Sequence, residues 1–415
     1  MIKSHRNIYS TTKNKEKNFI AMMRLCCGAH AQTPLNGITC MNKKLKAIVA
    51  AVLVCASAAS HAQSSITLYG LLDEGVTYVS NEAGKRFVGL IAGENFGNRW
   101  GLRGTEDLGN GYKAIFDLES DFDLNTGSTV AGIGSALFGR QAYVGLASPY
   151  GTVTLGRQYD FAWDFMTLGY FSPAAYALAT GGHIGDVDRQ GGDRLNNAVK
   201  YTSPTFDGLQ FGALYSFGGV PGQFSEDSAY SLGARYDGGN LQLAAVYTSV
   251  KNPAFFDPYG QLGVSSFLGQ ATTANGEDAY PEGNFALDRQ SSAEFGASYK
   301  FGALTAAGNI TATTFKGYGQ SEKLWIYEGG LIYSFTPKIQ GIAAYEYERT
   351  NGVHWNQPTV GTYYFLSKRT SFYAAASYQI ASGPVVAQQG QDFYWYTPSS
   401  NHEQASVRIA IIHKF

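Results

Sequence analysis

Cysteine is scarce in this chain and absent from most of it. The four cysteines are Cys26, Cys27, Cys40 and Cys55, and none follows residue 55. Disulfide bonds therefore cannot stabilise the long remainder of the chain, although an exported protein could use them.

Long apolar runs are also missing after residue 62. No stretch there approaches the ~18 consecutive apolar residues that indicate a membrane-spanning helix. The chain nevertheless has 25 Phe, 28 Tyr and 50 Gly, while its mean hydropathy is slightly negative. It is rich in aromatic residues without being uniformly apolar, which excludes a bundle of transmembrane helices.

The first 62 residues differ from the rest. Residues 41–62 combine three lysines with an apolar segment over 47–59 and the small-x-small ending Ser60-His61-Ala62. This pattern is typical of a secretory signal peptide, and the apolar segment is shorter than the ~20 residues of a spanning helix. We expect residues 1–40 to be a mis-assigned upstream extension, residues 41–62 to be the signal peptide, and the mature protein to comprise residues 63–415.

The mature part carries an excess of acidic residues. The whole chain has 31 Lys and Arg against 32 Asp and Glu; nine of these bases and one of these acids precede residue 63, which leaves 22 bases, 31 acids and a formal charge of −9. Nucleic-acid binding requires a clustered basic surface. We therefore expect no nucleic-acid partner.

Strict alternation of residue type dominates the mature part. Over residues 209–217 the odd positions are apolar or aromatic and the even ones are mostly small or polar, and residues 293–301 follow the same rule. This is the period of a strand with one apolar face.

Sixteen such segments occur, each about ten residues long, as a tilted membrane strand requires. Seven connections between them are very short and alternate with eight that we interpret as long. Short turns at one end and long loops at the other predict an all-β fold, a sixteen-stranded antiparallel transmembrane β-barrel. We expect the strands to begin near residues 66, 96, 112, 137, 151, 195, 208, 227, 241, 291, 304, 323, 339, 359, 370 and 403.

A soluble β-sandwich or repeat array is the alternative fold. It is disfavoured by the export signal, by polar residues on the second face, and by aromatic pairs at strand ends such as Tyr299 with Phe301. Aromatic girdles of this kind mark the two membrane interfaces.

Several motifs match a known family. The mature chain opens with Ser65-Ile66-Thr67-Leu68-Tyr69-Gly70, continues with the stretches 98–111, 139–146 and 151–159, and ends in a strand that stops at Phe415. Together these segments resemble the Gram-negative general porins, in particular the β-proteobacterial type, and the resemblance spans the mature chain.

The resemblance implies function, location and partners. It implies an outer-membrane channel for passive diffusion of small hydrophilic solutes and ions, assembled as a homotrimer among membrane lipid and lipopolysaccharide. It also implies that the barrel-assembly machinery reads Phe415, and that the third long loop folds into the lumen and narrows it.

The loop that corresponds to this constriction spans residues 160–193. In the family its acids face basic residues on the barrel wall, and such a field sorts ions. The expected loop residues are Asp160, Asp164, Asp186, Asp188 and Asp193.

The expected wall residues are Arg99, Arg103, Arg140 and Lys200. Arg99 and Arg103 share the parity of Gly101 whereas Trp100 and Leu102 take the other face, and an Arg facing lipid at mid-depth would cost ~2–4 kcal/mol. Parity also places Lys200 inside. Arg140 is placed in the lumen by resemblance alone.

Other function classes find little support. An enzyme would need a nucleophile with a base in reach, and the mature histidines, His183, His354, His402 and His413, are isolated in sequence. We interpret them as surface histidines of loops and termini, and expect no enzyme activity, no cofactor and no metal site.

Two alternative barrels stay open, an adhesin-like barrel and a substrate-specific channel of the sugar type. The sugar channel would line its constriction with aromatic residues, for which Tyr170, Phe171 and Tyr176 are available in the loop. Ion preference and exclusion limit do not follow from the sequence.

Overall fold

A computed structural model describes residues 64–129, 136–166, 171–391 and 394–415 of the chain. The expected upstream extension and signal peptide lie outside these residues, as does Tyr170. Within the described residues, no helix is long and apolar enough to cross a membrane.

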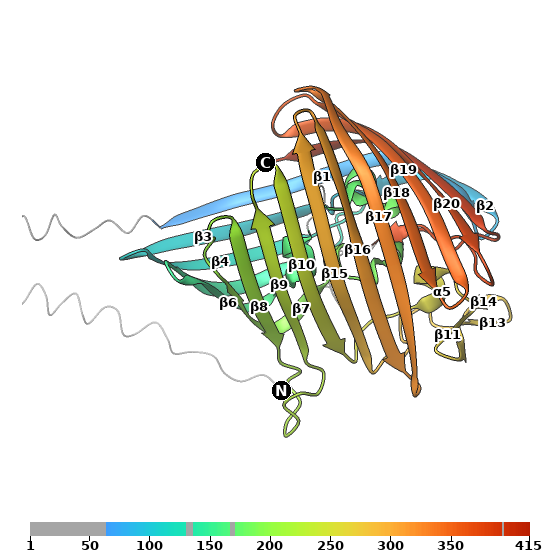
Figure 1. Cartoon of the computed structure of the whole chain (residues 1–415), viewed down its shortest axis with the longest axis horizontal. Helices are drawn as coiled ribbons and strands as arrows, with labels where there is room; N and C mark the ends of the chain where they lie inside the picture. The colour runs from blue at the N-terminus through green and yellow to red at the C-terminus, as the bar shows by residue number, and fades with distance from the viewer. Residues whose placement is uncertain (1–63, 130–135, 167–170, 392–393) are drawn as a thin grey trace, which may run out of the picture. The chain divides into compact units, whose positions relative to one another are not determined.

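One large antiparallel sheet closes on itself (Figure 1). It contains seventeen strands, and because β2 and β3 form one interrupted strand, the barrel has sixteen. The predicted fold class is therefore confirmed. The barrel strands are β1 Ser65–Glu82, β2 Lys85–Ala92, β3 Arg99–Gly109, β4 Tyr112–Asp121, β5 Gln141–Ser148, β6 Gly151–Tyr159, β7 Arg194–Thr202, β8 Leu209–Ser216, β9 Ala229–Asp237, β10 Leu241–Lys251, β15 Arg289–Phe301, β16 Leu304–Gly317, β17 Gln320–Thr336, β18 Ile339–Thr350, β19 Val353–Phe365, β20 Thr370–Ser382 and β23 Glu403–Lys414.

The remaining elements lie in the connections. The helices are α3 Phe161–Phe165, α4 Pro173–Ala177, α5 Pro258–Leu262 and the 3₁₀ turns η1 Ala179–Gly181 and η2 Ile184–Asp186. The short strands are β11 Ser266–Phe267, β12 Gln270–Ala271, β13 Thr273–Ala274, β14 Glu277–Asp278, β21 Gly390–Gln391 and β22 Tyr394–Trp395.

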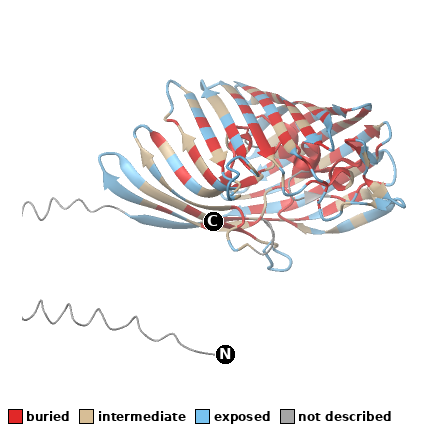
Figure 2. Cartoon of the chain, turned by 90° about the horizontal axis from the view of Figure 1, so that it is seen from below, coloured by how far each residue is buried: buried red, intermediate tan, exposed pale blue. Residues whose placement is uncertain are grey.

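The alternation predicted from the sequence sets the two faces of the wall. On β15, Phe295 is 51% exposed whereas its neighbours Glu294 and Gly296 are buried. Exposed and buried residues alternate along the strands in the same way (Figure 2). An outward apolar face and a polar inner face are what a barrel in a membrane requires.

Three connections expected to be long are tight turns, and the first of them joins β1 to β2 at Ala83-Gly84. The seven short turns are where the sequence placed them, but the β16–β17 and β18–β19 connections are also two-residue turns, at Tyr318-Gly319 and Asn351-Gly352. All four turn residues have positive φ, between 29° and 79°, which suits tight hairpin turns. The residues expected in long loops on either side of these turns belong to the strands instead. Strands β16 to β19 therefore have 12 to 17 residues rather than about ten.

The second strand also begins earlier than expected. The ladder starts at Lys85, leaves the sheet after Ala92 and resumes at Arg99 instead of near Phe96. The segment 93–98 between β2 and β3 is held by Asp73 of β1, whose Oδ2 accepts hydrogen bonds from the backbone N–H groups of Asn95 and Phe96, both at 2.9 Å.

Candidate functional site

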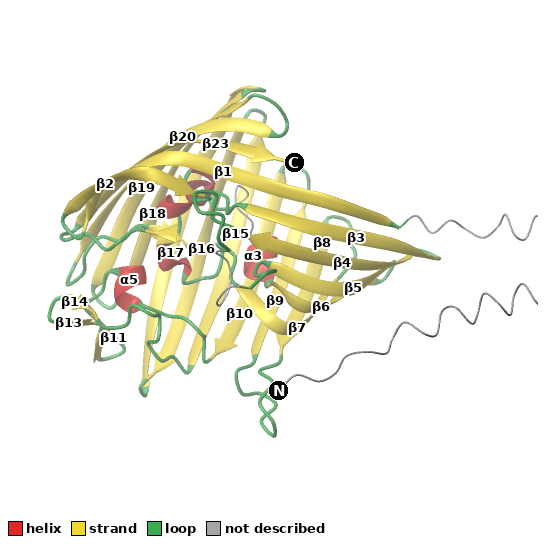
Figure 3. Ribbon diagram, turned by 180° about the vertical axis from the view of Figure 1, so that it is seen from behind, coloured by secondary structure: helices red, strands yellow, loops and turns green. Residues whose placement is uncertain are grey.

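The described parts of the connection between β6 and β7, residues 160–166 and 171–193, lie against the inner face of the barrel. Their backbone forms hydrogen bonds with side chains of four strands. The backbone N–H of Ala174 donates to Glu328 of β17 at 2.7 Å, and that of Ile184 donates to Glu348 of β18 at 2.8 Å. The backbone oxygens of Val187 and Gly182 accept from Gln290 of β15 at 2.6 Å and from Gln357 of β19 at 3.1 Å. Figure 3 shows α3 within the curve of the strands. This connection therefore occupies the lumen.

Helix α3 fixes the beginning of this loop. Asp160 caps it, since Oδ1 accepts from the backbone N–H groups of Ala162 and Trp163, while Oδ2 lies 2.6 Å from Arg189 Nε. A side-chain cap satisfies backbone donors that the short helix leaves open. Phe161 and Phe165 then pack with buried residues of β8 and β10.

The middle of the loop is held by an aromatic stack. Tyr176 lies on Tyr363 of β19 with ring centroids 5.2 Å apart, and its hydroxyl donates to Gln340 at 2.8 Å. Phe171 is fully buried. These two rings are engaged in packing, so they do not offer the open aromatic surface that the sugar-channel alternative needs.

The wall bases are largely paired with wall acids. Arg140 is buried and bonds to Glu119 and Asp121, both at 2.8 Å. Arg103 pairs with Asp117 at 2.9 Å. Arg99, on the same wall, lies opposite Asp121 in the β3–β4 register.

The loop acids are mostly paired within the loop. Asp193 bonds to Arg189 at 2.8 Å, Asp188 bonds to His183 at 2.5 Å, and Asp186 accepts from the backbone N–H of Gly191 at 2.5 Å. Opposite signs meet across loop and wall between Asp164 and Lys200, whose Nζ also donates to the backbone oxygen of Tyr159. The structure thus brings most of the expected residues together as local pairs rather than as two opposed rows.

Exposure separates the charges that solutes can meet from those that support the fold. The side chains of Arg103, Asp193 and Asp164 are 59%, 42% and 33% exposed. Arg140 and Asp160 are buried. An exposed charge is accessible from the solvent, whereas a buried pair mainly fixes its neighbours.

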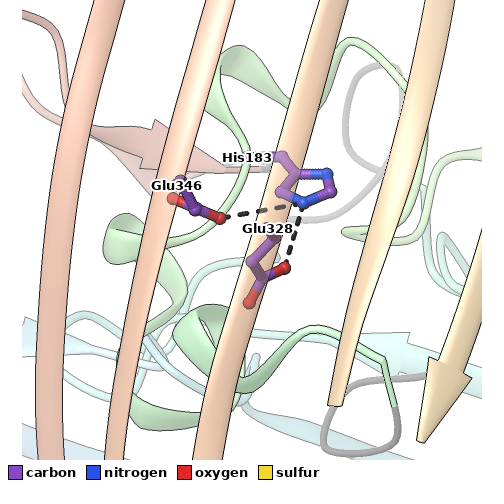
Figure 4. Close-up of side chains that lie close together, drawn as sticks. All are labelled: His183, Glu328 and Glu346. Atoms are coloured by element: carbon purple, nitrogen blue, oxygen red, sulfur yellow. Dashed lines mark hydrogen bonds and ion pairs between the residues drawn. The ribbon is translucent and has the colours of Figure 1, made fainter.

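Sequence reasoning missed a buried network around His183. This histidine is fully buried, so its interpretation as a surface residue is wrong. Its Nε2 lies 3.1 Å from Glu328 Oε2 and 3.7 Å from Glu346 Oε1 (Figure 4). Strand parity could have found both acids, because each alternates with outward residues on its strand.

The same network changes the pKa of the ring. Burial alone would lower the pKa of His183, but the carboxylate of Asp188 and the hydrogen bond to Glu328 outweigh burial and raise that pKa well above its usual value. These contacts fasten the loop to an acidic part of the wall.

Comparisons with known proteins support one family. A sequence profile described as Gram-negative porin matches residues 48–383. An outer membrane porin protein of Bordetella pertussis is 31% identical, with 80% of this chain and 93% of the relative covered. Outer membrane porin protein 32 of Delftia acidovorans is 30% identical, with 89% and 99% covered.

Solved structures show the same fold. An anion-selective porin from Comamonas acidovorans superposes with a TM-score of 0.69 at 24% identity, covering 85% of this chain and all of that one. The trimer form of an outer membrane protein of Vibrio cholerae gives a TM-score of 0.61 at 14% identity, covering 85% of this chain and 99% of the other.

Proposed function

From the premise that this chain belongs to the Gram-negative porin family and forms an outer-membrane β-barrel, we propose a function. The protein is a channel for passive diffusion of small hydrophilic solutes and ions. The observation that carries the proposal is the loop 160–193, which is bonded along the inner wall and leaves less of the lumen open. A water-filled barrel narrowed by a loop sorts solutes by size and charge.

The selecting charges in this proposal are the exposed ones. Arg103 on the wall and Asp193 and Asp164 in the loop present opposite signs to the lumen. The proposed constriction comprises wall bases and loop acids. The wall bases are Arg99, Arg103, Arg140 and Lys200, and the loop acids are the five aspartates named above. Within it, Arg140 and Asp160 position neighbours, and Arg103 and Asp193 set the field.

We further propose that the functional unit is a homotrimer. The trimer form of the Vibrio cholerae neighbour supports this assembly. The exposed apolar residues on the outer face of β5 and β6, among them Val144 at 57% and Leu155 at 50%, offer a contact surface. The mature chain would start at Gln63 after signal cleavage.

The outer rim carries a surface suited to lipopolysaccharide. Lys323, Arg349 and His354 line a hollow of about 440 Å³ together with Trp325 and Tyr347. The hollow lies beside the β16–β17 and β18–β19 turns, at the end of the barrel opposite the Pro337-Lys338 turn. Its β17 residues, Lys323 and Trp325, alternate with buried Leu324 and Ile326, so the hollow faces outward. Within the described chain these three bases form no ion pair with a carboxylate, which suits phosphate groups of the outer leaflet.

Liposome swelling tests the channel proposal. Vesicles containing the purified protein should swell in sugars at rates that fall smoothly with sugar size and do not saturate with concentration. Saturation by one sugar would favour the substrate-specific channel instead, and no swelling above protein-free vesicles would contradict both.

A further inference from the structure

His183, Glu328 and Glu346 meet where the lumen loop touches two adjacent strands. His183 lies in the loop, Glu328 on β17 and Glu346 on β18, and one ligand atom from each lies within 4.8 Å of the other two (Figure 4). All three side chains are buried. The arrangement joins parts of the chain more than 140 residues apart.

Each of these side chains is oriented through its other polar atom. Asp188 holds His183 through Nδ1, Gln357 donates to Glu346 Oε2 at 2.9 Å, and the backbone N–H of Ala174 donates to Glu328 Oε1 at 2.7 Å. A carboxylate on the far nitrogen of a histidine is the usual support of a histidine metal ligand, because it fixes the tautomer and the ring orientation.

One oxygen at the centre has no hydrogen-bond partner. Glu346 Oε1 is fully buried and makes no hydrogen bond, and it lies 3.7 Å from His183 Nε2. A buried carboxylate oxygen left unpaired is costly. It therefore points to a ligand that would complete the group.

The two separations from His183 Nε2 fit a small cation, and the third pair of ligand atoms lies within 4.8 Å. Tetrahedral ligands bound at about 2.0–2.1 Å to zinc are ~3.3 Å from one another. The two distances from Nε2, 3.1 and 3.7 Å, lie on either side of this value. Imidazole combined with carboxylates is a donor set that first-row divalent ions accept.

The local charge favours a cation as well. Glu348 also lies at this place, since its Oε1 accepts from the backbone N–H of Ile184, and its Oε2 is buried without a partner. Three carboxyl groups, of Asp188, Glu328 and Glu346, thus contact the imidazole, and that of Glu348 bonds to the backbone of the next residue.

We propose that His183, Glu328 and Glu346 bind one first-row divalent cation, of the zinc type, that clamps the lumen loop to β17 and β18. The clamp is independent of which solutes pass the channel. Because the group is buried, exchange with solvent requires local opening of the loop, so the ion would bind and leave slowly.

Metal content tests this proposal without reference to transport. Protein extracted from outer membranes is treated with chelator, dialysed for days against a low concentration of Zn²⁺, and its bound zinc is measured by mass spectrometry. One zinc per chain is expected, with at least a tenfold loss of affinity in His183→Gln and in Glu346→Gln. The matched control His402→Gln, at an exposed position outside both proposed sites, should bind as the wild type does.

A hydrogen-bonded imidazolium without metal is the competing account. It predicts no stoichiometric zinc in the wild type, and that result would overturn the proposal, as would equal binding in the His183 and Glu346 variants. X-ray absorption of the zinc-loaded wild type avoids variants altogether. It should show one imidazole and carboxylate oxygens at about 2.0–2.2 Å, and a shell of oxygen alone would contradict the assignment.

Discussion

Arg408 on the last strand and Asp73 on the first form a fully buried ion pair, with Nη2 and Oδ1 3.1 Å apart. The same guanidinium bonds to Glu94 at 2.8 Å and to the hydroxyl of Tyr373 at 2.6 Å. The pair thus joins the two strands whose meeting closes the barrel.

Replacing Arg408 with Met should weaken this closure. Two carboxylates would be left buried without their cation, and breaking such a pair from one side costs about 3–5 kcal/mol. The temperature at which the folded form converts to the unfolded form on SDS gels should fall clearly. A matched change at the exposed Arg86 should not move it, and an unchanged Arg408→Met barrel would show that the seam does not depend on this pair.

Arg103 and Arg140 should separate selectivity from stability. Arg103→Gln removes an exposed lumen charge, so the reversal potential in a salt gradient should move towards cations. Heat stability should fall less than in Arg140→Gln, because buried Asp117 keeps its hydrogen bond from the Tyr69 hydroxyl at 2.7 Å. Arg140→Gln unpairs buried Glu119 and Asp121, so it should lower heat stability. If Arg140→Gln shifts selectivity more than Arg103→Gln without destabilising the barrel, side-chain exposure does not identify the charges that select ions.

The connection between β10 and β15 should respond to pH through Asp257. Burial raises the pKa of this carboxyl to about 7, and the nearby Asp278 acts in the same direction. The raised pKa means that the closed loop holds the proton more tightly than the open loop, so the stability of the closed loop is greatest at low pH and declines as pH rises from ~4 to ~7.

Limited proteolysis of residues 252–288 measures this effect. Cleavage should be faster at pH 8 than at pH 5 relative to Asp257→Asn, which keeps the cap on α5 but cannot ionise. Glu277→Gln, at an exposed position, is the control. Equal pH dependence in the Asp257→Asn protein would contradict the assignment.

The outer rim should retain lipopolysaccharide. Lys323→Gln combined with Arg349→Gln removes two bases from the hollow, and the lipopolysaccharide that co-purifies per trimer should fall several-fold. Lys338→Gln, in a short turn at the other end of the barrel, should change nothing. Equal amounts of lipopolysaccharide in the wild type and both variants would show that this surface does not bind it.

The sequence predicted the barrel because period two and turn chemistry are local properties. The alternation over 293–301 reads directly as outward Phe295 and inward Glu294. The lumen loop was bounded correctly, since α3 starts after Asp160 and β7 begins at Arg194. The tight turns at Tyr318 and Asn351 do not follow from the sequence, because an exposed hairpin tip and a loop share the same polar, glycine-containing composition.

The pairing of charges was beyond the sequence. Parity places Arg103 inside, but nothing local says that Asp117 is its partner or that Asp188 turns to His183. His183 was misread because its burial depends on Glu328, 145 residues away. Only the closure of the barrel brings such residues together.

The central claim, a water-filled channel narrowed by the loop 160–193, is tested most directly by chemical modification of single channels. No cysteine follows residue 55, so Asp193→Cys and a control, Lys368→Cys in a short turn, each supply one thiol to the barrel. In planar bilayers, a bulky thiol reagent should lower the conductance of open Asp193→Cys channels in steps and leave Lys368→Cys channels unchanged. Unchanged conductance after complete labelling of Cys at position 193, or an equal fall in the control, would contradict a constriction at this loop.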